Sequence, residues 1–357
     1  MGQSPESRPQ ARNVSYAVFG SFCGSLLKKN GENFLNVTCP NSFHSFFEQV
    51  GTKKEPKKCR ITGLCPEPRR LLKKAGENFH PRIPHVERSP MKLFDSHAHY
   101  FDHKFDDLEG GAHAILTSSE FSESVGWVIN VGTNPETNRR CIEQTARYDF
   151  MWCAIGIHPH DCQHLDQTHD AVLAELYDMI RDPEARRRDK IVALGEIGFD
   201  YYWPPVNKDL QREYFSRQMD MARELDLPVI IHDREAHADS LEMVKQYPDV
   251  RGVFHCYSGS EDMVKDFLKL GWYISFGGPV TYKNAEKVRR AAAAVPLDRL
   301  LLETDCPYLT PHPHRGKINH SGRMHLVAEM QAELHDVTVE KIAQVTADNA
   351  KQLFQIY

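Results

Sequence analysis

Two histidines separated by one residue, His97 and His99, stand at the end of a short run that begins with the apolar residues Leu93 and Phe94. On a β-strand, side chains at positions i and i+2 point to the same face. Both imidazoles can therefore converge on one point where the strand ends, and imidazole is the commonest metal ligand in proteins. Neighbouring histidines are often a coincidence, so the rest of the chain must decide whether these two bind a metal.

Eight short, apolar, β-branched runs follow one another within residues 91–357, with amphipathic helical patterns between them. Near-continuous hydrophobic strands that alternate with helices indicate parallel strands covered on their outer side. Eight such units predict a closed (β/α)₈ TIM barrel, with a doubly wound open sheet as the alternative. The predicted strands are 93–97, 125–132, 151–158, 191–198, 228–233, 252–256, 273–278 and 300–305, and helices are expected over 209–225, 235–247, 261–270 and 284–294.

Histidines and carboxylates recur at the ends of six of these eight strands. In a barrel, the carboxyl ends of all strands meet at one mouth. Each residue has an ordinary explanation by itself, as a satisfied polar group or a helix cap, but that explanation has to be repeated six times. Four of the six histidines, together with the two carboxylates, would suit two divalent metal ions with a bridging carboxylate. The strand-end residues are His97 and His99, His158 and His160, Glu196, His232, His255 and Asp305.

These motifs resemble those of the TatD family of metal-dependent deoxyribonucleases, within the wider amidohydrolase-like metallohydrolases. The resemblance runs from Leu93 to about Phe354 and therefore covers nearly all of residues 91–357. The matching motifs are FDSHAH (94–99), GIHPH (156–160), GEIGFDY (195–201), LPVIIHDR (227–234), HCYSG (255–259) and ETDCPYL (303–309).

The resemblance implies a ligand set for two divalent metal ions. His97 and His99 would bind one ion, His232 and His255 the other, and Glu196 would bridge them. Asp305 would bind metal and position or deprotonate the attacking water, a role that suits a carboxylate held at a metal. Glu196 and Asp305 are thus the expected catalytic residues. Mixed histidine and carboxylate ligands accept Mg²⁺, Mn²⁺ or Zn²⁺, so the sequence does not select the metal.

The activity implied by the resemblance is hydrolysis of phosphodiester bonds in DNA or RNA, with 3′–5′ exonuclease cleavage of DNA favoured. Arg234 and Arg315 follow strands and are expected to hold phosphates. His158 and His160 are expected to contact substrate rather than to bind metal. One departure concerns residues 319–321, where relatives commonly have Asn-Glu-Pro and this chain has Asn-His-Ser. We expect that loop to border the substrate, and we expect Cys306, beside Asp305, to lie near the metals and add sensitivity to oxidants.

Two alternative functions stay open at this stage. The same metals could serve an amidohydrolase or esterase that acts on a small cyclic amide or on acylated tRNA. A lysine at the fourth strand would favour that branch, because many amidohydrolases bridge their metals with a carboxylated lysine, but the residue here is Glu196. A barrel that acts only as a scaffold, tethered to nucleic acid by a basic extension, would have no need of Asp305.

The charge of the chain is unevenly distributed. Residues 1–90 contain 15 Lys and Arg against 7 Glu and no Asp, a net charge of +8, so the total of −5 leaves −13 on residues 91–357. We expect residues 1–90 to form a basic, poorly ordered extension, in which residues 26–34 recur as 71–79 with eight of nine positions identical. Residues 91–357 are expected to form the barrel domain. An acidic barrel would need bound cations or local basic groups to attract nucleic acid.

The composition also limits location and redox state. Nine cysteines at irregular spacing do not suggest a disulfide framework. No apolar run approaches the roughly 20 residues of a membrane span. We therefore expect a soluble, cytoplasmic protein with reduced thiols; its oligomeric state cannot be predicted.

Residues 91–357 should fold and work without the preceding 90 residues. Expressed alone, this segment is expected to be soluble and to retain the metal binding and activity of the full chain, because every motif lies within it. Solubility, bound metal per chain and hydrolysis should be compared with those of residues 1–357. An insoluble or inactive fragment would show that the extension is required.

Overall fold

The computed structural model of the protein describes residues 27–29, 32–34 and 92–357. Strands β1 (Leu27–Lys29) and β2 (Glu32–Phe34) pair antiparallel, with Leu27 opposite Phe34. These strands fall in the first copy of the near-repeat. The second copy and the rest of the expected poorly ordered extension lie outside the described residues, and the division of the chain at residue 90 stays a prediction.

Eight parallel strands form one sheet whose order follows the chain, from β3 to β10. The sheet curls into a nearly closed barrel, so the predicted (β/α)₈ fold is confirmed. All eight predicted strands are present, and several end two or three residues earlier than expected because the chain turns at the mouth. The strands are β3 (Leu93–Ala98), β4 (Val125–Val131), β5 (Met151–Ile155), β6 (Ile191–Asp200), β7 (Val229–Arg234), β8 (Gly252–Phe254), β9 (Tyr273–Phe276) and β10 (Leu300–Leu302).

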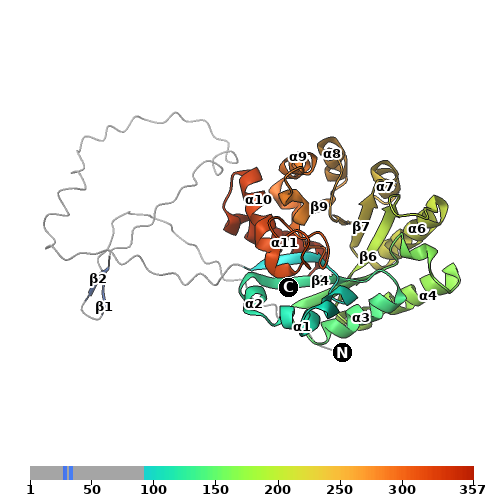
Figure 1. Ribbon diagram of the computed structural model, residues 1–357, viewed down its shortest axis with the longest axis horizontal. Helices are drawn as coiled ribbons and strands as arrows, with labels where there is room; N and C mark the ends of the chain where they lie inside the picture. The colour runs from blue at the N-terminus through green and yellow to red at the C-terminus, as the bar shows by residue number, and fades with distance from the viewer. Residues whose placement is uncertain (1–26, 30–31, 35–91) are drawn as a thin grey trace, which may run out of the picture. The chain divides into compact units, whose positions relative to one another are not determined.

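Helices connect successive strands and lie around the outside of the barrel (Figure 1). Two short helices follow β3, and two longer ones follow β10 at the end of the chain. The helices are α1 (Gly111–Leu116), α2 (Ser119–Ser124), α3 (Pro135–Thr145), α4 (His169–Ile180), α5 (Pro183–Arg188), α6 (Lys208–Leu225), α7 (His237–Val244), α8 (Glu261–Lys269), α9 (Glu286–Ala294), α10 (His325–His335) and α11 (Val339–Phe354). Short 3₁₀ turns cover His103–Asp107, Asp161–Gln163, Gly278–Thr281, Leu297–Arg299 and Ser321–Met324.

The interior of the barrel is a buried apolar cluster to which each of the strands β3 to β10 contributes. The cluster combines large side chains such as Phe94 and Tyr273 with small ones such as Ala154 and Ala193. Side chains at the end of α11, including Phe354, belong to the same cluster and close one end of the barrel. This packing leaves the other end, where the strands terminate in polar residues, available for a site.

The seam between the first and last strands of the barrel is held by hydrogen bonds and an isolated parallel bridge that pairs Ala98 with Cys306. The backbone N–H of Asp305 donates to the carbonyl of His97 (2.9 Å), and the N–H of His99 donates to the carbonyl of Cys306 (2.8 Å). Closing the barrel therefore also brings the two predicted histidines of β3 next to Asp305.

The fully buried Asp95 adds side-chain hydrogen bonds to this seam. Its carboxylate accepts hydrogen bonds from the backbone N–H and the hydroxyl of Thr304 (3.0 and 2.6 Å) and from the hydroxyl of Ser321 (2.6 Å). The Ser321 hydroxyl also lies 2.7 Å from the hydroxyl of Tyr100. Several donors shared by one buried carboxylate tie β3, the segment after β10 and the 3₁₀ turn that begins at Ser321 into one network.

None of the helices among the described residues is both long enough and apolar enough to cross a membrane.

Replacing Ser321 by alanine should destabilise the barrel, because it removes a donor from the buried carboxylate of Asp95 and a partner from Tyr100. Loss of a buried hydrogen bond to such a group costs about 1–3 kcal/mol, which lowers the melting temperature by roughly 2–4 °C per kcal/mol in a domain of this size. Thermal unfolding should be compared with Ser122→Ala, an exposed serine in α2. Equal melting temperatures for the two variants would show that the network contributes nothing to stability.

Candidate functional site

The two histidines at the end of β3 point their Nε2 atoms at the same place. The Nε2 atoms of His97 and His99 are 3.1 Å apart. The Nδ1 atom of His99 lies 2.7 Å from the backbone carbonyl of Val131, which can only accept a hydrogen bond. Nδ1 of His99 therefore donates to this carbonyl, and Nε2 is the ring nitrogen that faces the mouth of the barrel and is left for a ligand.

Two carboxylates complete a group of four ligand atoms around these histidines. The Oε2 atom of Glu196 lies 3.4 Å from Nε2 of His97 and 3.8 Å from Nε2 of His99. The Oδ1 atom of Asp305 lies 3.8 and 3.2 Å from the same two nitrogens. Ligands held about 2.1 Å from one ion in a tetrahedral arrangement would be roughly 3.4 Å apart. The ligand atoms of His97, His99 and Glu196 therefore fit a single divalent cation, and Oδ1 of Asp305 lies beside the two histidines.

The other oxygen of Glu196 belongs to a second group. Its Oε1 atom is 2.5 Å from Nδ1 of His232 and 2.7 Å from Nε2 of His255, and those two nitrogens are 3.2 Å apart. Glu196 thus directs one oxygen into each group, which is the arrangement of a bridging ligand. The structure brings together all six predicted metal-binding residues, and both groups are suited to hold a metal ion.

Glycine at position 198 permits the approach of β7 to β6 beside this second group. Its φ angle is +140°, a conformation that side chains rarely adopt, and a Cβ atom there would lie 2.0 Å from the carbonyl oxygen of His232. Gly198 is therefore needed for His232 to reach Glu196.

The electrostatics of the site favour bound cations. Burial would raise the pKa of Glu196, but the imidazoles around it, that of His255 first, hold this pKa well below its ordinary value. Burial also opposes ionisation of Asp305, yet the hydrogen bond with His99 lowers its pKa. Burial would lower the pKa of His232, but Glu196 and Asp200 raise it to about 9. The two ionised carboxylates thus favour positive charge on the ring nitrogens of the surrounding histidines. Protons and metal ions compete for these nitrogens.

Asp200 is a member of the site that the sequence analysis quoted within a motif but gave no role. Its Oδ2 atom lies 3.0 Å from Nε2 of His232, and its Oδ1 accepts hydrogen bonds from the backbone N–H groups of Tyr202 and Trp203. The pKa of Asp200 is lowered to about 2 against the effect of burial, chiefly by His232. An ionised Asp200 can only accept, so Nε2 of His232 carries the proton and Nδ1 is left for a ligand.

His158 and His160 differ in their placement. His158 is 3.6 Å from Glu196, measured from Nε2 to Oε1, while its Nδ1 accepts the backbone N–H of His160 (3.0 Å). Nε2 of His158 therefore carries a proton, and burial, with the nearby His232, lowers its pKa to about 4. This neutral imidazole offers an N–H donor at the site. The ring of His160 instead packs against His164, at 4.8 Å between centroids, so the structure does not bring it to the two groups.

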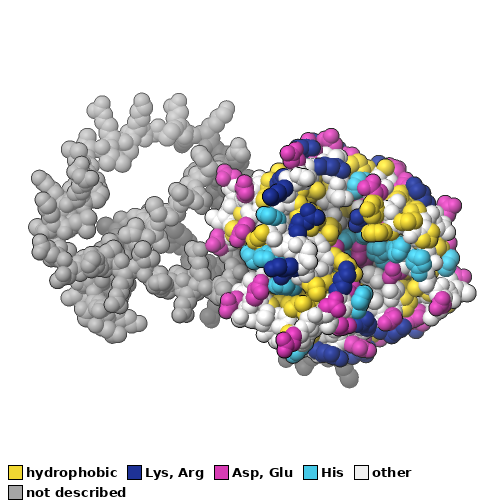
Figure 2. Space-filling model, in the orientation of Figure 1, with side chains coloured by type: hydrophobic (Ala, Val, Ile, Leu, Met, Phe, Trp, Pro, Cys, Tyr) yellow, Lys and Arg dark blue, Asp and Glu magenta, His cyan; other side chains and the backbone are white. Residues whose placement is uncertain are grey.

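Cationic side chains stack on aromatic rings around the mouth, and we call these the rim pairs. The guanidinium of Arg234 lies 4.2 Å from the ring centroid of Tyr202, and that of Arg315 lies 4.2 Å from the ring centroid of Tyr282. Tyr202 and Trp203 are about half exposed. Figure 2 shows histidine, basic and hydrophobic side chains gathered on the face turned to the viewer. Aromatic rings and cations side by side suit ligands that combine a flat base with a phosphate.

A cavity of about 560 Å³ opens beside one rim pair. Its lining includes Tyr282, Lys283, His312 and Arg315, which follow β9 and β10. The guanidinium of Arg289 donates to the backbone carbonyls of Tyr282 and Lys283 (2.7 and 3.2 Å) and so fixes the lining segment. The cavity has three cationic or titratable side chains and one aromatic ring, beside the segment that carries Asp305.

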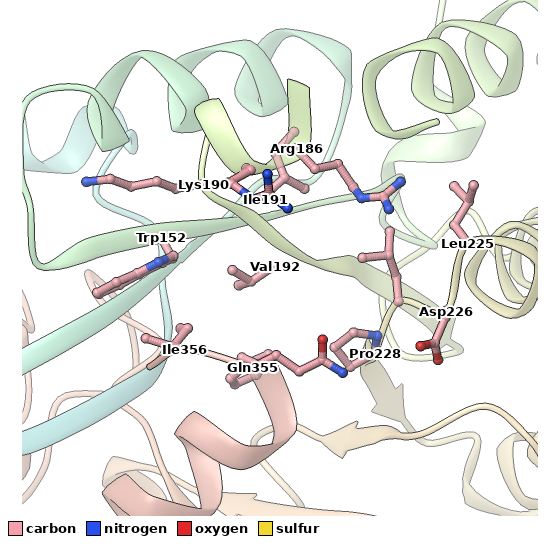
Figure 3. A pocket seen from close by; sticks show the side chains of 13 residues that line it. Trp152, Arg186, Lys190, Ile191, Val192, Leu225, Asp226, Pro228, Gln355 and Ile356 are labelled. Carbon is pink, nitrogen blue, oxygen red and sulfur yellow. The ribbon is translucent and has the colours of Figure 1, made fainter. Parts of the chain in front are cut away.

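A second cavity, of about 360 Å³, lies at the other end of the barrel (Figure 3). It is lined by residues at the starts of β5 and β6 and by the end of the chain, with Trp152, Val192 and Ile356 facing it. The metal-ligating groups found among the described residues lie elsewhere. In TIM barrels this end is associated with stability rather than with catalysis.

The structure departs from two expectations for the surroundings of the site. In the loop 319–321, expected to border the substrate, Asn319 and Ser321 are buried and donate inward, to the carbonyl of Thr304 and to the carboxylate of Asp95. Cys306, expected to be sensitive to oxidants, is fully buried, and burial raises the pKa of its thiol far above the ordinary value. Oxidants react with exposed thiolates, which Cys306 does not provide.

Comparison with known proteins agrees with this geometry. A family model described as "TatD related DNase" matches residues 94–355. The uncharacterized metal-dependent hydrolase YabD of Bacillus subtilis (strain 168) is 42% identical over 267 residues, which cover 74% of this chain and 99% of the relative. The uncharacterized metal-dependent hydrolase YcfH of Escherichia coli (strain K12) is 38% identical over 268 residues, 74% of this chain and 97% of the relative.

A solved structure is similar over the same region. The crystal structure of YJJV, a TatD homologue from Escherichia coli K12, aligns with a TM-score of 0.67 at 29% identity and covers 75% of this chain and 99% of its own. Sequence motifs, barrel and site thus agree over the same residues. The chain is a metal-dependent hydrolase that belongs to the TatD-related DNase family.

Proposed function

We propose that the protein hydrolyses phosphodiester bonds of DNA, as a 3′–5′ exonuclease that uses two divalent metal ions. The observation that carries this proposal is the pair of ligand groups that share Glu196, with Asp305 on one of them. His97, His99, Glu196 and Asp305 would hold one ion, and Glu196, His232 and His255 the other. The preference for DNA and the 3′–5′ direction come from the family resemblance rather than from a particular contact.

The residues around the metal groups would have separate roles in catalysis and in phosphate binding. Bound divalent ions would acidify a water molecule and offset the charge of the phosphate in the transition state. Asp305 is ionised and directs Oδ1 to the histidines, which leaves Oδ2 to accept the proton of the attacking water. The Nε2–H group of His158 would donate to a phosphate oxygen. Arg234 and Arg315 would hold neighbouring phosphates at the rim.

The rim pairs support a nucleic acid over a small amide or ester. A small substrate would need contacts only at the metal groups, whereas the cationic and aromatic side chains of the rim extend past them. The barrel segment as a whole is acidic, so these local cations are what would attract a polyanion. The same contacts would also accept RNA.

Hydrolysis should depend on metal and on Asp305. Metal-stripped protein is expected not to cleave a 5′-labelled single-stranded DNA, and Mg²⁺, Mn²⁺ or Zn²⁺ should restore stepwise shortening. Asp305→Asn should lower kcat by about 10²–10⁴-fold, because the amide cannot accept the proton of water. Asp336→Asn, an exposed residue after α10, is the matched control. No cleavage with any metal, by protein that binds two ions, would favour the amide or ester alternative.

Removal of a rim cation should weaken binding without slowing chemistry. Arg315→Ala is expected to raise the KM for an oligonucleotide about 5–30-fold with kcat nearly unchanged, since loss of a phosphate contact is worth roughly 1–2 kcal/mol. The slope of log KM against log salt concentration should also fall by about 0.7. Arg181→Ala, which removes an exposed arginine after α4, is the control. A fall in kcat with an unchanged KM would instead place Arg315 in the chemical step.

A further inference from the structure

Glu303, two residues before Asp305, is buried with no exposed surface. Neither of its carboxylate oxygens has a hydrogen-bond partner among the described residues. A buried carboxylate without donors is costly in free energy, so an arrangement that satisfies it is expected in the working protein.

The groups that can satisfy Glu303 are the imidazoles of His97 and His255. These rings are stacked, with centroids 3.9 Å apart and planes inclined by 12°. Both direct Nε2 toward Glu196, at 3.4 Å for His97 and 2.7 Å for His255. Their Nδ1 atoms therefore lie on the side of the rings away from Glu196, and both are buried without a partner in the described part of the chain.

Glu303 lies on that Nδ1 side. Its Oε1 atom is 3.6 Å from Nδ1 of His255. One ring nitrogen of His97, one of His255 and one carboxylate oxygen of Glu303 all lie within 4.8 Å of one another. The stacked rings thus have a carboxylate on each side: Glu196 faces both Nε2 atoms, while Glu303 faces Nδ1 of His255 and lies within 4.8 Å of a ring nitrogen of His97.

We propose that Glu303 is a shared positioning residue for both metal ions, which accepts Nδ1–H from His97 with one oxygen and from His255 with the other. This inference rests on the proposed two-metal centre. Protons fixed on Nδ1 leave the Nε2 lone pair of each ring for a ligand, the usual role of a carboxylate behind a metal-binding histidine. His97 belongs to one ligand group and His255 to the other, so one buried carboxylate would set the tautomer in both.

The other two ligand histidines have separate partners. His99 donates to the carbonyl of Val131, and His232 donates to Asp200. Each of these partners serves a single ring. Changes at Glu303 and at Asp200 should therefore differ in how many metal ions they affect, which makes the two positions a matched pair for an experiment.

The variant Glu303→Leu keeps the side chain close to its original size and removes both acceptor oxygens. Neither Nδ1–H would then have an acceptor, so neither ring would be held in the tautomer that leaves Nε2 for the metal. Zn²⁺ binding to the full-length chain should be measured by competition with a chromophoric chelator. Both affinities are expected to fall about 10–100-fold.

Asp200→Asn should lower the affinity for one ion by a similar factor and leave the affinity for the other within about threefold of the wild-type value. The exposed Glu333→Gln should change neither affinity. Two unchanged affinities in Glu303→Leu, or the loss of only one as in Asp200→Asn, would overturn the shared role. If the wild-type chain bound no Zn²⁺, the two-metal centre itself would fail, a result distinct from failure at Glu303.

A measurement on the wild-type protein covers the case in which Glu303→Leu does not fold. Nitrogen-15 NMR of the histidine rings in the zinc-loaded full-length chain should show His97 and His255 both with the proton on Nδ1. A proton on Nε2 of either ring, or an unprotonated Nδ1, would overturn the proposal.

Discussion

Hydrogen bonds across the seam between β3 and β10 join residues that are 206 to 209 positions apart in the chain. Backbone groups of His97 and His99 pair with those of Asp305 and Cys306, so the same contacts that close the barrel also set the distance between the ligand atoms. Asp95 secures this seam from inside, through Thr304 and Ser321. Because the site is assembled on paired strand ends rather than on free loops, its atoms can be held to the precision that metal binding requires.

Charge is the second constraint on the site. Two carboxylates are buried among imidazoles at the mouth, and such a group is stable only if each charge has a partner and each imidazole a defined proton. His99 and His232 obtain that definition from a carbonyl and from Asp200, and a third buried carboxylate, Glu303, stands behind the remaining two rings. The groups that fix the protons on the imidazoles are therefore as important for metal binding as the ligands themselves.

Family membership and geometry bear on different parts of the function. Membership establishes a metal-dependent hydrolase, while the named relatives are described as uncharacterized. The proposed nuclease activity draws on contacts around the metal groups: an N–H donor on His158 and cations stacked on aromatic rings at the rim. Substrate choice depends on those outer contacts, because the same metal groups could hydrolyse other bonds.

The sequence by itself determined the barrel and the six residues at its mouth. Strand and helix patterns repeat eight times, and parallel strands in a barrel must end on one side, so residues at strand ends could be placed together without knowledge of their contacts. The sequence also indicated Asp200 and Glu303, because each is a carboxylate within a few residues of an expected metal ligand. Their burial, which only the structure shows, distinguishes them from carboxylates that cap helices.

The tertiary structure decided where each side chain points. His160 follows the same strand as His158, but its ring packs against His164 instead of facing the ligand groups. Ser321 likewise turns inward to Asp95. Backbone angles and the packing of adjacent segments set these directions. Asp305 adopts a φ angle of +55° that no spacing rule would indicate. The proton positions on the ring nitrogens likewise depend on partners from distant strands. Periodicity fixes which residues share a face, but the atoms that face one another depend on how the strands are closed and twisted.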